Sequence, residues 1–517
     1  MEPTERRRIA RGCICVEVKN EFGMAFGVAI HFVLAFRVGS ATLCLFAPSA
    51  AFLNRGTHML TVRTGTPGVN CHGTSRRTAI KAGLFGATGL SLASLLKMQA
   101  TAASPTSKEK SVILLWLDGG PSQLEMYDPK PDAAVEYRGP FGVAKTKLPG
   151  VLVSEIMPHT ARHADKIALV RSLHHGTGDH FAAAHWMLTG KFGSTTVRQA
   201  QMSPSVGSYI AKIKGPASPG MPAYVGLPAA ESVYLYPGYM GAAYLGGQYN
   251  PFNVNKEVAY LAANDTRQVR SPKWLGALSQ SSGSMLDAKS NLLKQFDSIR
   301  RDVDTSGTVE SMDVYQQQAN DLVMGSKARE AFDLDKEDPR SSDRYGQGPW
   351  GRYTLMARRL VEAGVRFVTV DMPHWDDHSN IKEGHGRKVP VVDRAVGALL
   401  DDLSERGMLD DVIVLVMGEF GRTPKINTGQ PGIPIPGRDH WGAAISAMIA
   451  GGGLKGGQVI GKTSKNAEYP VDRALKPADL LATIYHQLGI DHGTMFKDHT
   501  GRPIPMLDEG QPIRELI

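Results

Sequence analysis

Five side chains of types that bind metals or transfer protons fall directly after predicted strands or in the loops that follow them. They are Asp118, Asp376, His378, Glu419 and His440. Carboxylates and imidazoles together suit zinc, manganese or iron, whereas calcium and magnesium prefer sites built from oxygen alone. The five residues therefore predict a site for one or two divalent metal ions, with zinc or manganese favoured over calcium.

Each of these residues also has a structural interpretation. Asp118 stands in the sequence DGGP, which can simply close a turn, and an Asp–His pair can be a hydrogen bond that holds a loop. Two arginines, Arg422 and Arg438, lie near the predicted site. A guanidinium can clamp an anionic ester, or it can form an ion pair with Glu419 or Asp439. The gathering of several such residues at strand ends is what favours a metal.

Apolar runs and amphipathic stretches alternate along the body of the chain. Strands are predicted at residues 112–117, 167–170, 365–370 and 412–417, and helices at residues 352–363, 391–406 and 477–488. The 391–406 helix would follow Pro390, which suits a first helical turn, and would end at Gly407. This alternation predicts an α/β fold in which a mostly parallel sheet is sandwiched by helices. The carboxyl ends of its strands would carry the candidate site.

Three stretches depart from this alternation. Residues 215–254 are rich in Gly, Pro and Tyr, and we expect a long surface excursion that walls a pocket. Residues 255–345 are mainly polar and predict a helical insertion. The sequence GGQVIGKT at 456–463 fits the P-loop pattern. A P-loop needs a helix that opens at its Lys-Thr, however, and here a polar stretch ending at Pro470 follows, so we expect no nucleotide site.

The first hundred residues predict an export signal. Arg76 and Arg77 precede an uncharged run at 82–96 and small residues at 100–102, which is the order of a twin-arginine leader. The expected divisions are a non-native or disordered extension at 1–58, a signal region at 59–103 and a body at 104–517. We expect that body to be exported to the periplasm or cell envelope.

The composition agrees with export and argues against other classes. All four cysteines precede residue 72, so the predicted body has no thiol to oxidise. The formal net charge of +8 comes largely from the first hundred residues and does not indicate nucleic-acid binding. After residue 102 no run is apolar enough to cross a membrane.

Five motifs in order carry a resemblance to a known family: WLDGGPS at 116–122, WDDH at 375–378, VMGEFGRTP at 416–424, GRDHW at 437–441 and GGQVIG at 456–461. From about Ser111 to the C-terminus, the chain resembles the sulfatase-like domain of unknown function 1501 family. The resemblance implies an alkaline-phosphatase-like core with a bimetal site at the strand ends. Asp118 would match the first metal aspartate, Asp376 and His378 earlier ligands, and His440 the final histidine.

Two positions depart from the pattern that the resemblance implies. Counting back from Gly190 places His180 where sulfatases carry a Cys or Ser nucleophile. His180 could be a metal ligand, a nucleophile, or a relic in a site that only binds. Phe420, after Glu419, stands where the superfamily has a histidine ligand. We therefore expect one metal, or a shifted pair completed by one of His174, His175 and His374.

The function expected from these observations is a metal-dependent hydrolase of sulfate or phosphate esters. His180, Arg422 and Arg438 would be its catalytic residues, and its substrate would be an anionic ester such as that of a sulfated polysaccharide. The alternative is a non-catalytic sulfatase-like protein that binds an anionic glycan or a partner in the cell envelope.

Overall fold

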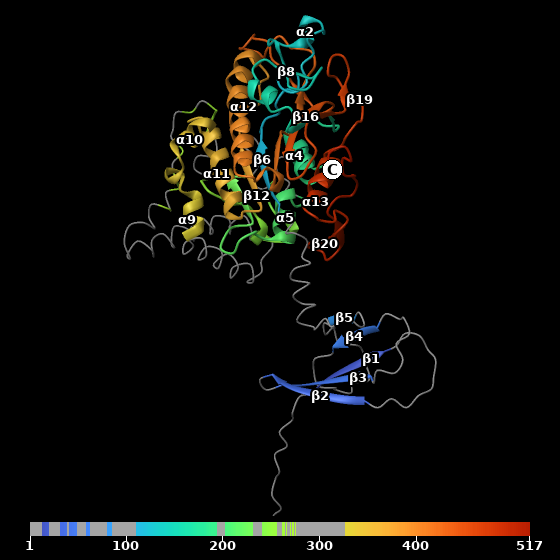
Figure 1. Cartoon of the computed structure of the whole chain (residues 1–517). Coiled ribbons are helices and arrows are strands. Elements are labelled where there is room, and N and C mark those ends of the chain that lie inside the picture. Colours follow the sequence, from blue (N-terminus) through green and yellow to red (C-terminus); the bar gives the residue numbers. More distant parts are fainter. Residues whose placement is uncertain are drawn as a thin grey trace, which may run out of the picture. The chain divides into compact units, whose positions relative to one another are not determined.

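The structure is a computed structural model. It describes residues 110–193, 202–230, 240–255 and 326–517, some positions between 261 and 275, and five strands of the N-terminal part. The chain divides into two compact units, Met1–Thr106 and Ser107–Ile517, and each is described by itself (Figure 1).

The N-terminal unit contains one sheet of five strands among its described residues. They are β1 (Cys13–Lys19), β2 (His31–Val38), β3 (Ala41–Pro48), β4 (His58–Val62) and β5 (Ile80–Leu84), in the order β2-β3-β1-β4-β5. The predicted extension and signal region fall in this unit, and Arg76 and Arg77 lie outside the described residues. Export therefore stays a prediction.

The second unit is organised around an eight-stranded sheet. Its strands, in spatial order, are β11 (Phe252–Asn253), β10 (Tyr224–Leu227), β12 (Phe367–Asp371), β6 (Ser111–Trp116), β13 (Val412–Met417), β16 (Ile445–Gly451), β9 (Ile167–Leu173) and β17 (Gln458–Ile460). Among the described strands of this sheet, only β16 runs antiparallel to its neighbours, and the other pairs are parallel. The predicted mostly parallel sheet is confirmed.

Alternate side chains of β6 enter two different cores, as a strand buried on both faces requires. Ile113 and Leu115 belong to one core, whereas Leu114 and Trp116 belong to the other. The first core is covered by α3 (Pro158–Arg162), α9 (Ser326–Phe332), α10 (Pro339–Tyr345), α11 (Pro349–Ala363) and α12 (Ile381–Glu405). The second is covered by α4 (His180–Thr189), α5 (Val206–Lys214) and α13 (Pro477–Gln487). Figure 1 shows these two helical layers on opposite sides of β6 and β12.

The register of the three central strands explains why distant segments meet. Trp116, at the end of β6, pairs with Asp371 of β12 on one side and with Met417 of β13 on the other. The loops that follow these strands therefore start at the same edge of the sheet, which is where open α/β sheets place their ligands.

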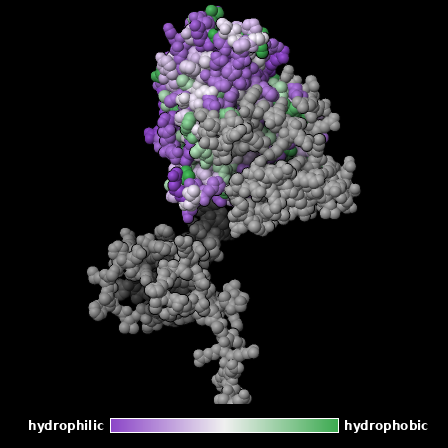
Figure 2. Space-filling model, turned by 180° about the vertical axis from the view of Figure 1, so that it is seen from behind, coloured by the Kyte–Doolittle hydropathy of each residue, from purple (hydrophilic) through white to green (hydrophobic). Residues whose placement is uncertain are grey.

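Smaller elements complete the second unit. They are α2 (Val135–Arg138) and the two-stranded pairs β7 (Val143–Lys145) with β8 (Leu152–Ser154), β14 (Gly421–Arg422) with β15 (His440–Trp441), β18 (Lys462–Thr463) with β19 (Pro470–Asp472), and β20 (Met495–Lys497) with β21 (Pro503–Pro505). Lys462 and Thr463 therefore begin a strand pair, where a P-loop would begin a helix. Hydrophilic and hydrophobic residues are interspersed on the face that Figure 2 shows. None of the helices in the described part of the chain has both the length and the apolar character that a bilayer crossing needs.

The predicted start of the 391–406 helix is wrong. The helix α12 begins at Ile381, and Pro390 lies inside it. A proline inside a helix removes one backbone hydrogen bond and crowds the preceding turn, at a cost of about 3 kcal/mol. Contacts that His385 and Lys388 make with Asp377 hold the turns before the proline in place. The preference of proline for a first helical turn predicts a helix start at this position, but these contacts continue the helix through Pro390.

The surface excursion predicted at 215–254 is also wrong in part. Tyr224–Leu227 and Phe252–Asn253 are strands of the central sheet, and all four residues of β10 are buried. Gly226 has no room for a side chain, because an added Cβ would lie 2.3 Å from the Ala230 nitrogen. The glycine that suggested a loop is therefore required by close packing. Residues 231–239 of this stretch, and 276–325 of the predicted helical insertion, lie outside the described residues.

Candidate metal centre

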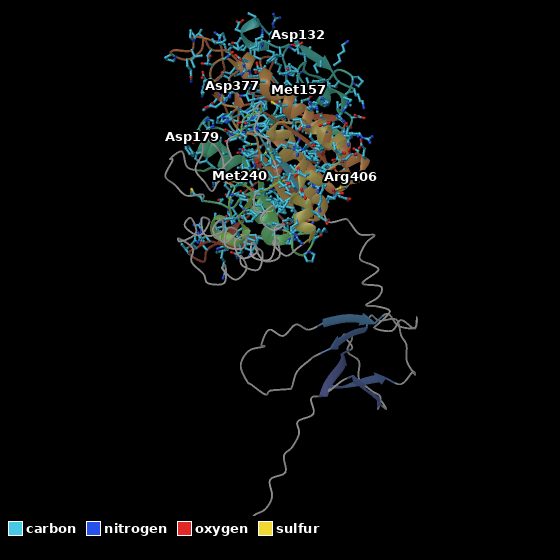
Figure 3. All side chains as sticks on the ribbon, turned by 90° about the vertical axis from the view of Figure 1, so that its left-hand side faces the viewer. Asp132, Met157, Asp179, Met240, Asp377 and Arg406 are labelled. Atoms are coloured by element: carbon cyan, nitrogen blue, oxygen red, sulfur yellow. The ribbon has the colours of Figure 1, made fainter. Side chains whose placement is uncertain are left out.

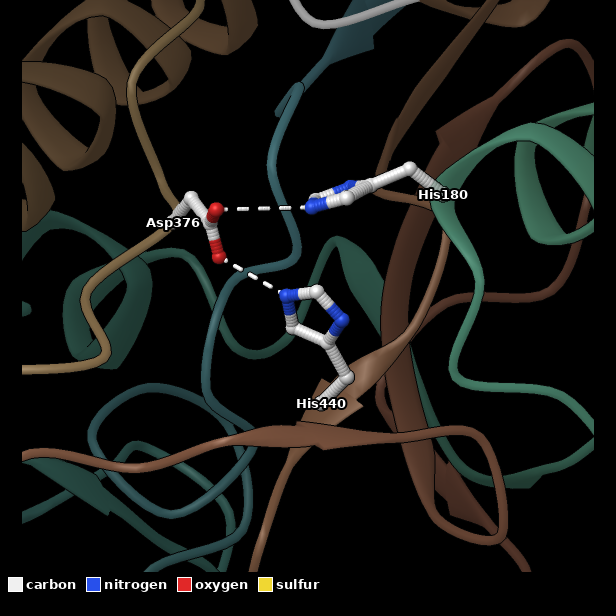
Figure 4. Close-up of side chains that lie close together, drawn as sticks. All are labelled: His180, Asp376 and His440. Carbon is white, nitrogen blue, oxygen red and sulfur yellow. Dashed lines mark hydrogen bonds and ion pairs between the residues drawn. The ribbon is translucent and has the colours of Figure 1, made fainter. Parts of the chain in front are cut away.

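Three imidazoles converge on one carboxylate at the carboxyl edge of the sheet. The Asp376 Oδ1 atom lies 2.9 Å from His440 Nε2 and 3.0 Å from His378 Nε2. Its Oδ2 atom lies 3.4 Å from His180 Nε2. Figure 4 shows the rings of His180, at the start of α4, and His440, on β15, pointing toward Asp376. His180, Asp376 and His440 lie far apart in the sequence, and the register of the central strands brings their segments together.

The opposite nitrogen of each imidazole has its own partner. His440 Nδ1 donates to the Gly178 carbonyl oxygen at 2.7 Å, because a carbonyl can only accept. His378 Nδ1 lies 2.7 Å from Asp439 Oδ1, and His180 Nδ1 lies 2.8 Å from Glu419 Oε1. Histidines that bind metals are typically held in this way, with the second nitrogen bonded to a carboxylate or a backbone carbonyl. This leaves the Nε2 atoms as the potential ligand atoms.

The donor atoms are close enough to share one ion. His180, Asp376 and His440 each offer one ligand atom, and these atoms all lie within 4.8 Å of one another. His378 contacts the same carboxylate. The side chains of His180, Asp376, His378 and His440 are 15%, 21%, 23% and 19% exposed. A ligand could therefore reach the cluster from solvent, as an ion with an open coordination position would require.

Glu419 contacts the cluster through His180 and is fully buried. Its Oε1 atom accepts a hydrogen bond from the Gly119 amide at 2.8 Å and contacts His180. Its Oε2 atom is buried and meets no hydrogen-bond donor among the described residues. A buried carboxylate oxygen without a partner is unfavourable unless a cation or a proton compensates it. This orphan oxygen, together with the nitrogen and oxygen donor set, fits a divalent cation.

The charges of the cluster shift the pKa values of its members. Burial opposes the charged form of His180, but hydrogen bonds to Asp376 and Glu419, and their charges, raise its pKa to about 10. Burial alone would raise the pKa of Asp376, but bonds from the three imidazoles and the charge of Arg422 hold it well below its usual range. The pKa of His378 is raised, mainly by its bond to Asp376. The raised pKa values of His180 and His378 favour their protonated forms, and a metal that binds these rings would displace the protons.

Arg422 holds Asp376 in place. Its Nη2 atom donates to Asp376 Oδ1 at 2.8 Å and to the carbonyl oxygens of Gly119 and Trp375, and its Nε donates to the Gly120 carbonyl oxygen at 2.7 Å. The pairing of β14 with β15 sets Arg422 opposite His440. Arg422 therefore joins the segments that follow β6, β12 and β13 around the carboxylate of the cluster.

Arg438 is fully buried, and its hydrogen bonds indicate a structural role in place of the predicted catalytic one. Its Nε and Nη2 atoms donate to Glu125 Oε1 at 3.0 and 2.9 Å. Its remaining N–H groups donate to the carbonyl oxygens of Thr423, Pro424 and Tyr137. These bonds leave Arg438 no donor for an ester. Arg422 thus pairs with Asp376, and Arg438 pairs with Glu125. The ion-pair alternative predicted from the sequence had Glu419 or Asp439 as the partner.

Asp118 is buried at the end of β6, and its Oδ1 atom accepts from Trp116 Nε1 at 3.3 Å. Its backbone connects β6 to the segment after β12, because its amide donates to the Met372 carbonyl oxygen and its carbonyl accepts from the Trp375 amide. It is not one of the three residues whose donor atoms lie within 4.8 Å of one another. Its role as a ligand stays a prediction.

Phe420 packs against two of the imidazoles, which also contact each other. Its ring stacks on His440, with centroids 4.3 Å apart and planes at 29°, and it meets the His180 ring at 4.9 Å. An added Cβ at Gly120 would lie 2.3 Å from Phe420, so this glycine leaves room for the ring. His175 is directed to the Glu419 carbonyl oxygen at 2.7 Å. Phe420 therefore contributes an apolar ring to the cluster, and the number of metal ions stays a prediction.

Two parts of the site are not predicted by the sequence reasoning. The Gly178 carbonyl oxygen is a backbone group, and its role depends only on where the loop before α4 passes. Asp439 was considered only as a partner of an arginine, yet it accepts from His378. Its position directly before His440 was the one available signal.

The fold and the site define an α/β protein whose mostly parallel sheet carries a histidine–aspartate cluster at its carboxyl edge, with the donor set of a divalent-metal site. The chain belongs to the family described as "Protein of unknown function (DUF1501)", whose profile matches residues 109–517. This confirms the resemblance in the sequence motifs. A search of curated proteins finds no match.

Solved structures with a similar fold include three enzymes. They are the PsFucS1 sulfatase from Pseudoalteromonas sp. (13% identity, 76% of this chain and 70% of that chain, TM-score 0.34), the phosphonate monoester hydrolase of Agrobacterium radiobacter (11%, 79% and 77%, 0.35) and the lipoteichoic acid synthase LtaP from Listeria monocytogenes (10%, 80% and 78%, 0.34). Activity depends on the side chains of the site rather than on the fold.

Proposed function

We propose that the protein is a metal-dependent hydrolase of sulfate or phosphate esters. The observation that supports this proposal is the convergence of His180, His378 and His440 on Asp376, with the second nitrogen of each ring held by its own partner. Mixed imidazole and carboxylate donors favour zinc or manganese over calcium. The substrate class comes from the family motifs, and an anionic ester suits a site that offers a cation.

The residues of the cluster have distinct roles in this proposal. His180, Asp376 and His440, whose donor atoms lie within 4.8 Å of one another, would hold the cation, and His378, which contacts the same carboxylate, would join them. A bound cation would act as a Lewis acid toward the ester oxygen. Glu419 fixes the ring of His180, and Arg422 fixes the carboxylate of Asp376. Buried Phe420 excludes water from one side of the imidazoles. Preorganised groups of this kind need no rearrangement when charge develops on the substrate.

Elemental analysis of the purified full-length protein tests the proposal directly. We expect about one equivalent of zinc or manganese, because one set of donors lies within reach of a single ion. Removal of the metal by a chelator should abolish turnover of aryl sulfate or aryl phosphate, and adding the metal back should restore it. Protein that contains no metal, and that stays inactive with added zinc, manganese or calcium, would contradict the proposal. Bound metal without turnover would favour the alternative, a binding protein for an anionic glycan or an envelope partner.

We also propose that the protein is exported by the twin-arginine pathway to the periplasm or cell envelope. The support is the order of Arg76-Arg77, the uncharged run and the small residues at 100–102. Protein recovered from the periplasmic fraction should begin near residue 103. Replacement of both arginines by lysine should leave the uncleaved chain in the cytoplasm. Unchanged processing of this variant would exclude the twin-arginine route.

A further inference from the structure

The side chain of Asp377 turns away from the cluster and toward α12. Asp377 stands between Asp376 and His378 in the 374–378 segment, which carries two of the candidate ligands. Lys388 Nζ, on α12, lies 2.8 and 2.7 Å from its two carboxylate oxygens. The same ammonium group donates to the His374 carbonyl oxygen. One buried lysine therefore contacts the segment at two points.

The backbone of the 374–378 segment needs such support. His374 has a φ of 75°, which is left-handed and unfavourable for a residue with a side chain. Lys388 donates to the carbonyl oxygen of this same residue. The next side chain, Trp375, is buried and stacks on Trp350, with ring centroids 5.8 Å apart. A strained conformation persists only when the surrounding structure fixes it, and here α12 supplies part of that structure.

A buried histidine connects the same segment to the turn after β6. His385, on α12, accepts a hydrogen bond from the Ser122 amide at its Nε2 atom, at 3.0 Å. Its Nδ1 atom must then carry the proton, and it donates to Asp377 Oδ2 at 2.7 Å. Burial lowers the pKa of His385, in agreement with this neutral form. Gly384 lets Asp377 approach, because an added Cβ would lie 2.4 Å from its Oδ2 atom.

We infer that Lys388 and His385 are positioning residues for the candidate metal centre. They hold Asp377, and through it they direct Asp376 and His378 toward His180 and His440. In the described hydrogen bonds, the partners of Lys388 and His385 are Asp377, the His374 carbonyl oxygen and the Ser122 amide, and not the four residues of the cluster. Lys388 also neutralises Asp377, so that the charge of Asp376 remains available to a cation. The inference rests on the proposed function, because it assigns these contacts a purpose in metal binding.

The test compares two buried cations on the same helical layer in the full-length protein. Lys388→Met keeps the length of the side chain and its packing on Trp375 but removes the charge and the donors. We expect zinc or manganese affinity to fall about 10- to 100-fold, as when a group that orients a ligand is lost. At saturating metal, KM for an aryl ester should change little. Wild-type affinity in Lys388→Met would overturn the inference.

Arg358→Met is the matched control, because Arg358 is also buried and joins α11 to α12 through Asp402. Figure 3 shows Asp377 well apart from Arg406, which is a partner of Asp402 near the far end of α12. The control should lose stability but keep its metal affinity. Equal loss of affinity in both variants would mean that general destabilisation is the cause, and would overturn the inference.

Two further measurements keep the inference testable if Lys388→Met is unstable or if the wild type binds no metal. The double variant Asp377→Asn, Lys388→Met leaves no buried charge unpaired, so we expect its stability to recover while its metal affinity stays low. Amide hydrogen exchange in metal-free protein should become faster across 374–378 in Lys388→Met and stay unchanged in α11. Unchanged exchange in the segment would overturn the inference. Absence of metal from the wild type would instead overturn the proposed function.

Discussion

Asp376→Asn is expected to abolish metal binding and ester hydrolysis while the fold stays intact. Asparagine keeps the shape of the side chain but removes the negative charge on which His180, His378, His440 and Arg422 converge. The loss of metal affinity and of kcat/KM should exceed about 100-fold, which is more than the loss of an orienting group usually causes. Calorimetric titration with zinc and manganese, and turnover of aryl esters, measure the two effects.

Asp439→Asn is the comparison for this variant. Asp439 accepts from His378 Nδ1 at 2.7 Å, but its side chain is 52% exposed and it does not contact Asp376 in the described contacts. We expect metal affinity to fall by no more than about 10- to 100-fold, because the ring of His378 loses its orienting partner while all the metal donors are kept. Wild-type metal affinity in Asp376→Asn would mean that the cluster is only a network of ion pairs. In that case the binding-protein alternative would gain support.

The central strands could be predicted because they are buried on both faces. A strand in a parallel sheet has apolar neighbours above and below it, so its sequence is an unbroken apolar run, as in β6 and β13. The same logic placed Asp376, Glu419 and His440 near one edge. It fails for β10, where Gly226 and the nearby prolines looked like a loop. Close packing against Ala230 selects the glycine, and no local pattern reveals that neighbour.

The partners of the arginines could not be predicted from the sequence. Arg438 binds Glu125, which is 313 residues away along the chain. Nothing local distinguishes a guanidinium that faces a substrate from one that is buried against a distant carboxylate. Pro390 misled the prediction for the opposite reason. Its local preference for a helix start is real, but the contacts of His385 and Lys388 with Asp377 extend α12 by about two and a half turns before it.

Arg358→Met is expected to lower the free energy of unfolding by about 3 to 5 kcal/mol. The Arg358 side chain is 1% exposed, and its nitrogens lie 2.6 Å from Glu337, 2.6 Å from Glu362 and 2.8 Å from Asp402. Glu337 and Asp402 are themselves nearly buried. Glu337 keeps a contact with Arg359, and Asp402 keeps one with Arg406, but these cations are 13% and 34% exposed. Removing the guanidinium therefore takes from both carboxylates the partner that is best shielded from water, and this penalty exceeds the gain from burying a methionine. Urea unfolding of the variant and the wild type measures the difference.

Arg344→Met separates burial from charge pairing as the cause. Arg344 lies 2.7 Å from Glu405, a distance similar to those around Arg358, but the two side chains are 35% and 59% exposed. Solvent screens such a pair, so we expect a change of about 0 to 1 kcal/mol. Equal losses in the two variants would show that burial does not decide the effect. A larger loss of unfolding free energy in Arg358→Met than in Arg344→Met, as we expect, would show that the buried ion pairs of Arg358 stabilise the packing of α11 on α12.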